Sequence, residues 1–382
     1  MESSNKNKLS KDDYLRYSRH LTLPGFGINA QEKLINSNVL VVGAGGLGSP
    51  IIIYLAAAGV GRIGIVDFDI VDKSNLQRQI IHNVKWIGKP KVESAKERVK
   101  EINPNIIVEV HYIKLNDNNV LDTLKEYDLV CDGTDNFESR YLLNDASVIL
   151  KKPYIYGSIL QFEGHVSVFN LKDNSPSYRD FIYEAPPEGM VPSCAEGGVI
   201  GVLPGVIGTI QATEAIKVLT GIGKPLDGRL LIYDAIEMRF TEFEIKKDPK
   251  RESIDKIKAS KQDQGSINTK NSSVEISVKE LNSLRSKESD EIALIDVRTI
   301  QERNICSIKE SIHIPLNKII KWEFTNEEVI NIKNRIIIVY CKTGVRSEKA
   351  IEIFKKHGLA AKTLKGGIIE WGKVIDNSIN LY

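Results

Sequence analysis

The sequence has few cysteines and no hydrophobic run long enough to cross a membrane. Its four cysteines stand at positions 131, 194, 306 and 341, and none form a C-x-x-C pair, which argues against a disulfide framework or a cysteine zinc cage. No apolar segment approaches the roughly 20 residues of a membrane span, and the polar start of the chain lacks a secretory signal. A net charge of only +2 argues against nucleic acid or an anionic membrane as the main partner. The absence of a disulfide framework predicts a reducing compartment.

The length and composition predict two domains joined by a linker. The 382 residues, 42% hydrophobic and 27% charged, are sufficient for two cores of ordinary size. Residues 246–273 are mostly lysine, serine, aspartate and glutamine, so they predict a flexible linker that spans roughly 30 Å. We therefore expect domains at 1–245 and 274–382.

A glycine-rich turn organises the first domain. Val39–Val42 is a short apolar run typical of a buried parallel strand. Gly43, Gly45 and Gly48 follow as G-x-G-x-x-G and open a predicted helix that ends at Gly59. Glycines let the backbone approach a phosphate closely, and the helix N-terminus offers free N–H groups to it. The pattern predicts a nucleotide site.

The glycine turn alone leaves the type of nucleotide open. An acidic residue about 20 positions on, as Asp67 is here, is typical of a dinucleotide oxidoreductase that uses NAD. However, Arg78 in SNLQRQ and Lys91 in GKPK follow the turn. Both cations suit the oxygens of a triphosphate, so the motifs favour ATP.

Two acids follow a later strand of the same domain. Asp132 and Asp135 come just after the predicted strand Asp128–Cys131. They either hold Mg²⁺ or cap the helix expected from Asn136.

Composition and spacing do not assign a function to two further residues, Cys194 and Arg19. Cys194 lies in SCAEGG, within the irregular stretch Leu171–Gly198; such long loops are often functional, but a lone cysteine is commonly a small buried residue. Arg19 lies on a predicted helix headed by Ser10, where an arginine is ordinarily only solvated.

The second domain has a cysteine in a reactive setting. The predicted strand Arg335–Tyr340 ends at Cys341, and Arg346 and a helix from Ser347 to His357 follow. Backbone amides in such a loop hold an anion above the sulfur and favour its thiolate form. The thiolate then either attacks phosphate esters or accepts sulfane sulfur.

Together these motifs resemble two known families. Residues 14–249 resemble the MoeB/ThiF family, relatives of ubiquitin-activating enzymes, through RYSRH, GAGGLG, DFD, SNLQRQ, GKPK, DGTDN, SCAEGG and GTIQATEAIK in the family's order. The residues from 274 onward resemble a rhodanese domain. The resemblance implies an α/β protein, with a Rossmann-like adenylation domain of the ubiquitin-activating type followed by a small α/β rhodanese domain.

The resemblance also implies an activity and its partners. Members of the family use ATP and Mg²⁺ to adenylate the C-terminal Gly-Gly of a ubiquitin-like sulfur-carrier protein, and they release pyrophosphate. The carrier we expect first is the small subunit of molybdopterin synthase, with carriers of the thiamine, tRNA-thiolation and cysteine pathways as alternatives. The resemblance further implies a homodimer and an upstream donor of persulfide sulfur.

Site residues follow from matching positions. By resemblance, Gly46 and Asp67 contact the backbone and ribose side of the nucleotide, Asp135 associates with Mg²⁺, Asn136 lies beside it, and Arg19 reaches into the partner subunit's site. By resemblance, Asn75, Arg78 and Lys91 form the phosphate-binding set, and Ser74, Leu76 and Gln77 are also nucleotide-binding residues. Of these groups, Arg78, Lys91 and Asp135 are expected to be catalytic.

Two cysteines match the sulfur chemistry of the resembled families. Cys194 matches a cysteine implicated in a covalent link to the carrier, and Cys341 matches the cysteine that carries a persulfide. The persulfide loop is then Cys341, Lys342, Thr343, Gly344, Val345 and Arg346.

The sequence departs from the family pattern in two places. Ser177 and Asp180 stand where a first zinc-binding C-x-x-C pair would fall, and DPKRES after Lys247 has no cysteine, so we expect no structural zinc. SIKES at Ser307–Ser311 replaces the usual histidine- and glycine-bearing segment, which makes sulfur transfer less firmly expected than adenylation. The Ile-, Lys- and Asn-rich usage is typical of an AT-rich genome and predicts cytoplasm, or plastid stroma for a plastid-encoded chain.

Overall fold

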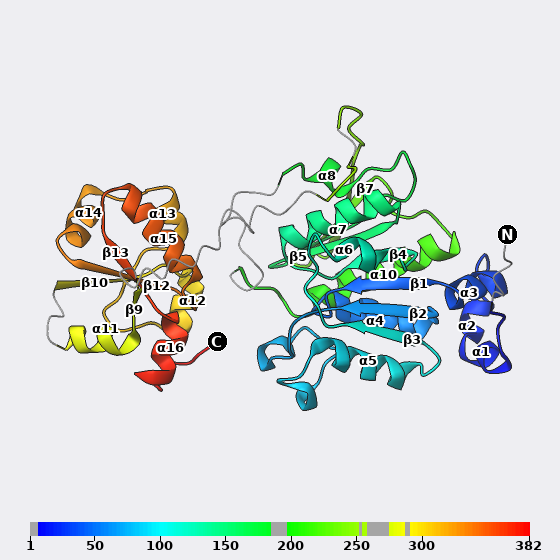
Figure 1. The fold of residues 1–382 in the computed structure, drawn as a ribbon, viewed down its shortest axis with the longest axis horizontal. Helices are drawn as coiled ribbons and strands as arrows, with labels where there is room; N and C mark the ends of the chain where they lie inside the picture. The colour runs from blue at the N-terminus through cyan, green and yellow to red at the C-terminus, as the bar shows by residue number, and fades with distance from the viewer. Residues whose placement is uncertain (1–6, 185–196, 252–253, 258–274, 287–290) are drawn as a thin grey trace. The chain divides into compact units, whose positions relative to one another are not determined.

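The α/β fold class is confirmed. The computed structural model describes residues 7–184, 197–251, 254–257, 275–286 and 291–382. Two compact units divide between residues 263 and 264, and each contains one sheet with helices on both faces (Figure 1). Within the described residues, no helix is long and apolar enough to span a membrane.

The first unit is built on an eight-stranded sheet in the order β3-β2-β1-β4-β5-β6-β7-β8. The strands from β3 to β5 are parallel, and β6, β7 and β8 continue the sheet as antiparallel neighbours. The strands are β1 Asn38–Val42, β2 Arg62–Val66, β3 Ile107–His111, β4 Leu129–Asp132, β5 Tyr154–Leu160, β6 Glu163–Phe169, β7 Arg229–Asp234 and β8 Arg239–Glu244.

Helices cover both faces of this sheet, so its central strands are apolar on both sides. Helices α3, α4, α5 and α10 pack on one face and α6, α7 and α8 on the other. Their bounds are α3 Gly27–Ile35, α4 Gly48–Ala58, α5 Lys91–Ile102, α6 Val120–Leu124, α7 Phe137–Leu150, α8 Tyr178–Phe181 and α10 Leu203–Thr220. Shorter elements are α1 Lys11–Arg16, α2 Ser18–Leu21, and the 3-10 turns η1 Lys73–Asn75 and η2 Val84–Trp86.

Most predicted elements are present, with shifted ends. Ser10 caps α1 by accepting a hydrogen bond from the Asp13 amide, and Gly59 ends α4 with a φ of +87°. Strand β6 pairs antiparallel with β5. Helix α10 begins at Leu203, and Pro204 suits its first turn.

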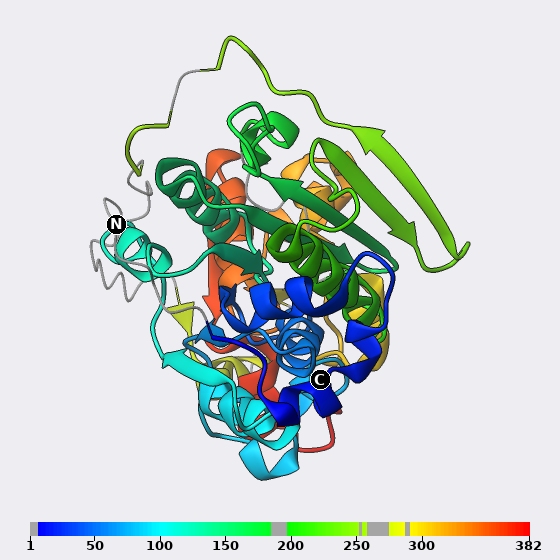
Figure 2. The ribbon, with the colours of Figure 1, turned by 90° about the vertical axis from the view of Figure 1, so that its right-hand side faces the viewer.

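The β7–β8 hairpin ends the first sheet. Figure 2 shows it in yellow-green at the sheet's margin, and all six residues of β8 are exposed. Beyond it, Lys247 Nζ donates to the Asp173 carbonyl and the Asp248 amide donates to Asp180 at 2.9 Å. These contacts attach the first residues of the predicted linker to the first unit.

The second unit has a parallel sheet in the order β11-β10-β12-β13-β9. Helices α13, α14 and α15 cover one face, and α11 and α16 cover the other. The strands are β9 Glu275–Ile276, β10 Ile292–Asp296, β11 Ile312–His313, β12 Ile336–Tyr340 and β13 Ala361–Leu364. The helices are α11 Val278–Arg285, α12 Ile300–Ile305, α13 Leu316–Ile320, α14 Asn326–Lys333, α15 Val345–Lys356 and α16 Gly367–Val374.

Candidate functional site

A pocket opens at the carboxyl ends of β1 and β4, where the strand order reverses. Open α/β sheets bind ligands at this point, because the loops after the two strands diverge to opposite faces. The glycine turn after β1 and the DGTDN segment after β4 both line the pocket.

The glycine turn is packed too closely for side chains. Gly43 has a φ of +94°, which favours glycine. A Cβ on Gly48 would lie 1.8 Å from the Gly43 carbonyl oxygen, and one on Gly133 would lie 2.6 Å from the same atom. This contact brings the ends of β1 and β4 together with the start of α4, and a helix N-terminus is where backbone N–H groups bind anions.

Asp67 lies at the end of β2 and braces the turn. Its carboxylate accepts hydrogen bonds from the amides of Ala44 and Asp69, each at 2.8 Å. Burial raises the pKa of Asp67, whereas the Lys91 ammonium and these two amides oppose that shift. Each carboxylate oxygen keeps a second lone pair, so the side chain retains capacity to accept ribose hydroxyls.

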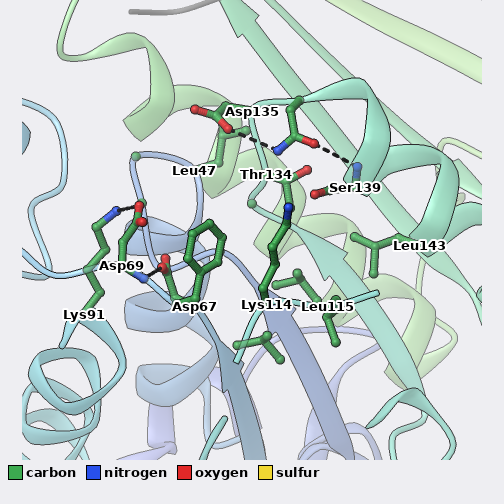
Figure 3. Close-up of a pocket in the computed structure, with 18 of the residues that line it drawn as sticks. Leu47, Asp67, Asp69, Lys91, Lys114, Leu115, Thr134, Asp135, Ser139 and Leu143 are labelled. Carbon is green, nitrogen blue, oxygen red and sulfur yellow. Dashed lines mark hydrogen bonds and ion pairs between the residues drawn. The ribbon is translucent and has the colours of Figure 1, made fainter. Parts of the chain in front are cut away.

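The two cations predicted from the sequence, Lys91 and Arg78, line the same pocket. The Lys91 ammonium pairs with Asp69 at 2.8 Å on one side of it, as Figure 3 shows. Arg78 Nη1 donates to the Ser74 carbonyl at 3.2 Å and the side chain lines the pocket. These two groups can offset the charge of phosphate oxygens.

Only one of the two acids after β4 is available to a ligand. Asp132 is fully buried; it accepts from the Tyr154 hydroxyl at 2.5 Å, and burial raises its pKa. Asp135 is exposed and lines the pocket (Figure 3). Asn136 caps α7 through a bond from the Ser139 amide. A magnesium site built on both aspartates is therefore wrong, and Asp135 alone has an oxygen that fits the ion.

The pocket gathers about half of the predicted nucleotide set. Gly46, Asp67, Arg78, Lys91, Asp135 and Asn136 line it. Ser74, Asn75, Leu76 and Gln77 do not line it, because η1 is closed on itself by bonds between Asp72 and the first two of them. Arg19 is exposed on α2 and is also not a lining residue.

Three residues that line the pocket were not predicted from the sequence. Gln79 and Arg140 are both buried and line the pocket, and neither Gln79 Oε1 nor Arg140 Nε has a hydrogen-bond partner within the described part of the chain. Lys114 extends into the pocket from the loop after β3. Gln79 is the last residue of the SNLQRQ motif, so its position beside Arg78 could have predicted that it lines the pocket. Unpartnered buried groups fit a polar ligand.

The positions that correspond to zinc ligands in the family pattern form a helix cap and an ion pair instead. Ser177 and Asp180 form a helix cap with an Oγ–Oδ2 distance of 2.9 Å. Asp180 also pairs with Arg251 at 3.3 Å. A serine, a carboxylate and a guanidinium are not a thiolate set, so these residues do not fit structural zinc.

In the predicted persulfide loop, a backbone amide contacts the cysteine sulfur. Cys341 follows β12, and its Sγ accepts from the Gly344 amide at 3.1 Å and lies 3.8 Å from Ser347 Oγ. Arg346 forms a two-pronged ion pair with Glu302, at 2.7 Å for each nitrogen. Cys194 lies outside the described residues, and its role stays a prediction.

Two family matches together account for most of the chain. The ThiF family matches residues 17–253, and the rhodanese-like domain matches residues 277–373. The chain belongs to the ThiF family. It is an adenylyltransferase of that family with a C-terminal rhodanese-like domain, which disfavours the NAD-dependent alternative.

Similar proteins agree with this architecture. "Probable adenylyltransferase/sulfurtransferase MoeZ" of Mycobacterium tuberculosis is 45% identical over 98% of this chain and 96% of its own length. "Probable molybdopterin-synthase adenylyltransferase" of Porphyra purpurea is 40% identical over 96% and 95%. "Sulfur carrier protein adenylyltransferase" of Thermus thermophilus is 48% identical over 63% and 90%. The E. coli MccB structure with ATP shares the fold, with a TM-score of 0.56 and 21% identity over 63% of this chain and 74% of that chain.

Proposed function

We propose that this ThiF-family enzyme uses ATP and Mg²⁺ to adenylate the C-terminal Gly-Gly of a ubiquitin-like sulfur-carrier protein. The observation that carries the proposal is the pocket at the β1–β4 switch point, which unites the glycine turn, Asp67, two cations and Asp135. The printed names of the relatives support a sulfur carrier as the second substrate.

The chemistry assigns each group a role. The terminal carboxylate of the carrier attacks the α-phosphorus of ATP, the bond to the β-phosphate oxygen breaks, and pyrophosphate leaves. Arg78 and Lys91 stabilise the charge that develops on the phosphate oxygens. Asp67 accepts the ribose hydroxyls, and Asp135 would hold Mg²⁺, whose charge offsets that of the leaving group.

Sulfur transfer follows from the second domain. An upstream donor loads Cys341 as a persulfide, and its outer sulfur attacks the adenylated carrier and displaces AMP, which leaves an acyl disulfide. A second thiol attacks the Cys341 sulfur, so the thiocarboxylate leaves and a disulfide forms. A cellular thiol reductant supplies that second thiol and then restores Cys341. We propose Cys194 as the covalent link: its thiolate displaces AMP to form a thioester with the carrier, and the persulfide then attacks this thioester in place of the adenylate and displaces the Cys194 thiolate.

We also propose which carrier the enzyme uses and how its subunits assemble. The small subunit of molybdopterin synthase is the first carrier to test, in keeping with the name of the Porphyra purpurea relative. Arg19, exposed on α2, is proposed to complete the site of a second copy in a homodimer. We place the enzyme in cytoplasm, or in stroma for a plastid-encoded chain.

Carrier-dependent ATP–pyrophosphate exchange tests the proposal. Exchange should require a carrier that ends in Gly-Gly and should vanish in Asp135→Ala. Asp122→Ala is the matched control, since Asp122 is a surface carboxylate paired with Lys125 outside the pocket. Absence of exchange with every such carrier, from a folded protein, would reject adenylation.

A further inference from the structure

The chain after α16 returns to the persulfide loop and ends with Tyr382 against it. The Tyr382 hydroxyl donates to Glu302 Oε1 at 2.7 Å and accepts from Arg298 Nη1 at 3.1 Å. The Lys342 ammonium lies 4.4 Å from the centre of the Tyr382 ring. The Tyr382 side chain thus contacts both Glu302 and Lys342, which are distant in sequence.

Glu302 connects the tyrosine to the second cation of the loop. The carboxylate that accepts the Tyr382 hydroxyl also receives both nitrogens of Arg346 at 2.7 Å. Arg346 and Tyr382 lower the pKa of Glu302 to about 2 against the opposing effect of burial, so Glu302 stays ionised. Burial raises the pKa of Tyr382, so its hydroxyl remains a donor to Glu302.

Helix α16 holds the other side of the same loop. The amides of Ile368 and Ile369 donate to the carbonyls of Cys341 and Lys342, at 3.0 and 3.2 Å. The backbone at the start of the loop is therefore fixed by α16, whereas Lys342 and Arg346 are the side chains that the following segment can orient.

We propose that Tyr382 is a positioning residue for the persulfide loop, which holds Lys342 by its ring and Arg346 through Glu302. The inference rests on the proposed role of Cys341 as a persulfide carrier. Tyr382 lies beyond the range matched by the rhodanese-like family, residues 277–373. It touches no reacting atom; its effect is to place two positive charges where an anionic sulfur donor binds.

Positioned cations act mainly on the binding of an anion. In thiosulfate–cyanide sulfur transfer we expect Tyr382→Ala to raise the KM for thiosulfate about fivefold, as loss of a cation–π contact and one charge-assisted hydrogen bond implies, with kcat changed by less than about twofold. Tyr382→Phe keeps the ring and should restore most of the KM. Leu381→Ala is the control, since Leu381 is the neighbouring residue in the chain and its side chain lies beside Gly372 of α16.

A second readout does not depend on turnover. Calorimetry of thiosulfate binding in a Cys341→Ser background, where no turnover occurs, should show a dissociation constant about fivefold higher with Tyr382→Ala and an unchanged one with Leu381→Ala. An unchanged KM and dissociation constant in Tyr382→Ala would overturn the inference. So would equal losses of kcat and unfolding temperature in both variants, because packing alone would explain them. Wild-type protein without Cys341-dependent turnover would reject the proposed function, and the binding measurement would still decide the positioning role.

Discussion

The Lys91 ammonium lies 2.8 Å from the Asp69 carboxylate, and its side chain is only 7% exposed. Asp69 follows β2, and Lys91 begins α5. Both residues line the pocket at the β1–β4 switch point, so the ion pair holds the ammonium beside that pocket. A phosphate can share this ammonium with Asp69, because it has three donors.

Loss of the Lys91 charge should slow adenylation far more than loss of its orienting partner. We expect Lys91→Met to lower kcat in carrier-dependent pyrophosphate exchange by about 10²–10³, as removal of one transition-state stabiliser does. Asp69→Asn leaves the ammonium in place and should cost about tenfold, mainly in the KM for ATP. Equal effects of the two variants would show that the pair acts only in folding.

Two glycines near helix starts form a matched pair for substitution. Gly48 of the glycine turn begins α4, and Gly205 lies in the first turn of α10. Gly48→Ala would place a Cβ 1.8 Å from the Gly43 carbonyl oxygen, whereas Gly205→Ala meets nothing within 4 Å. We expect Gly48→Ala to destabilise the domain by more than about 2 kcal/mol and Gly205→Ala to stabilise it by up to about 1 kcal/mol. Urea unfolding measures both. A Gly48→Ala protein as stable as wild type would contradict the packing described for the turn.

His82 predicts a pH dependence of stability. Its Nε2 bonds the Ala44 carbonyl at 2.8 Å and its Nδ1 bonds Ser94 Oγ at 2.9 Å. Burial lowers its pKa from 6.5 to about 4. In the unfolded chain the imidazole takes a proton below pH 6.5, whereas in the folded protein it does so only near pH 4. The free energy of unfolding should therefore fall as the pH drops from 6.5 to 4.

Two histidine variants separate His82 from other titrating groups. Denaturant unfolding at pH 7.5 and pH 5 should show a smaller difference in His82→Gln than in wild type. His165→Gln removes a partly exposed histidine on β6 and serves as the control for the loss of one imidazole. An undiminished difference in His82→Gln would assign the pH effect to other groups.

The two thiols of the second unit test the sulfurtransferase. Cys341→Ser should reduce thiosulfate–cyanide sulfur transfer by more than about 10²-fold, because the thiolate is the nucleophile. Cys306→Ser, a change in a half-buried thiol near Arg298, should retain the wild-type rate within about twofold. A rate unaffected by Cys341→Ser would mean that the domain is a non-catalytic scaffold.

Local sequence determined the elements and the order in which they present their motifs. Apolar runs, the glycine at position 59 and the cap at Ser10 specify their own strands and helix ends through short-range sterics and hydrogen bonds. The glycine turn and the loop after Tyr340 could therefore be identified as sites, because their chemistry lies in the backbone of consecutive residues.

Tertiary structure decided which side chains face a ligand. Asp132 and Asp135 look equivalent in sequence, but the first is buried against Tyr154 and only the second reaches the pocket. Gln79 and Arg140 line one pocket, and Tyr382 contacts Lys342, only after strands pair and helices pack. No local pattern encodes these contacts, because burial and distance depend on the whole fold.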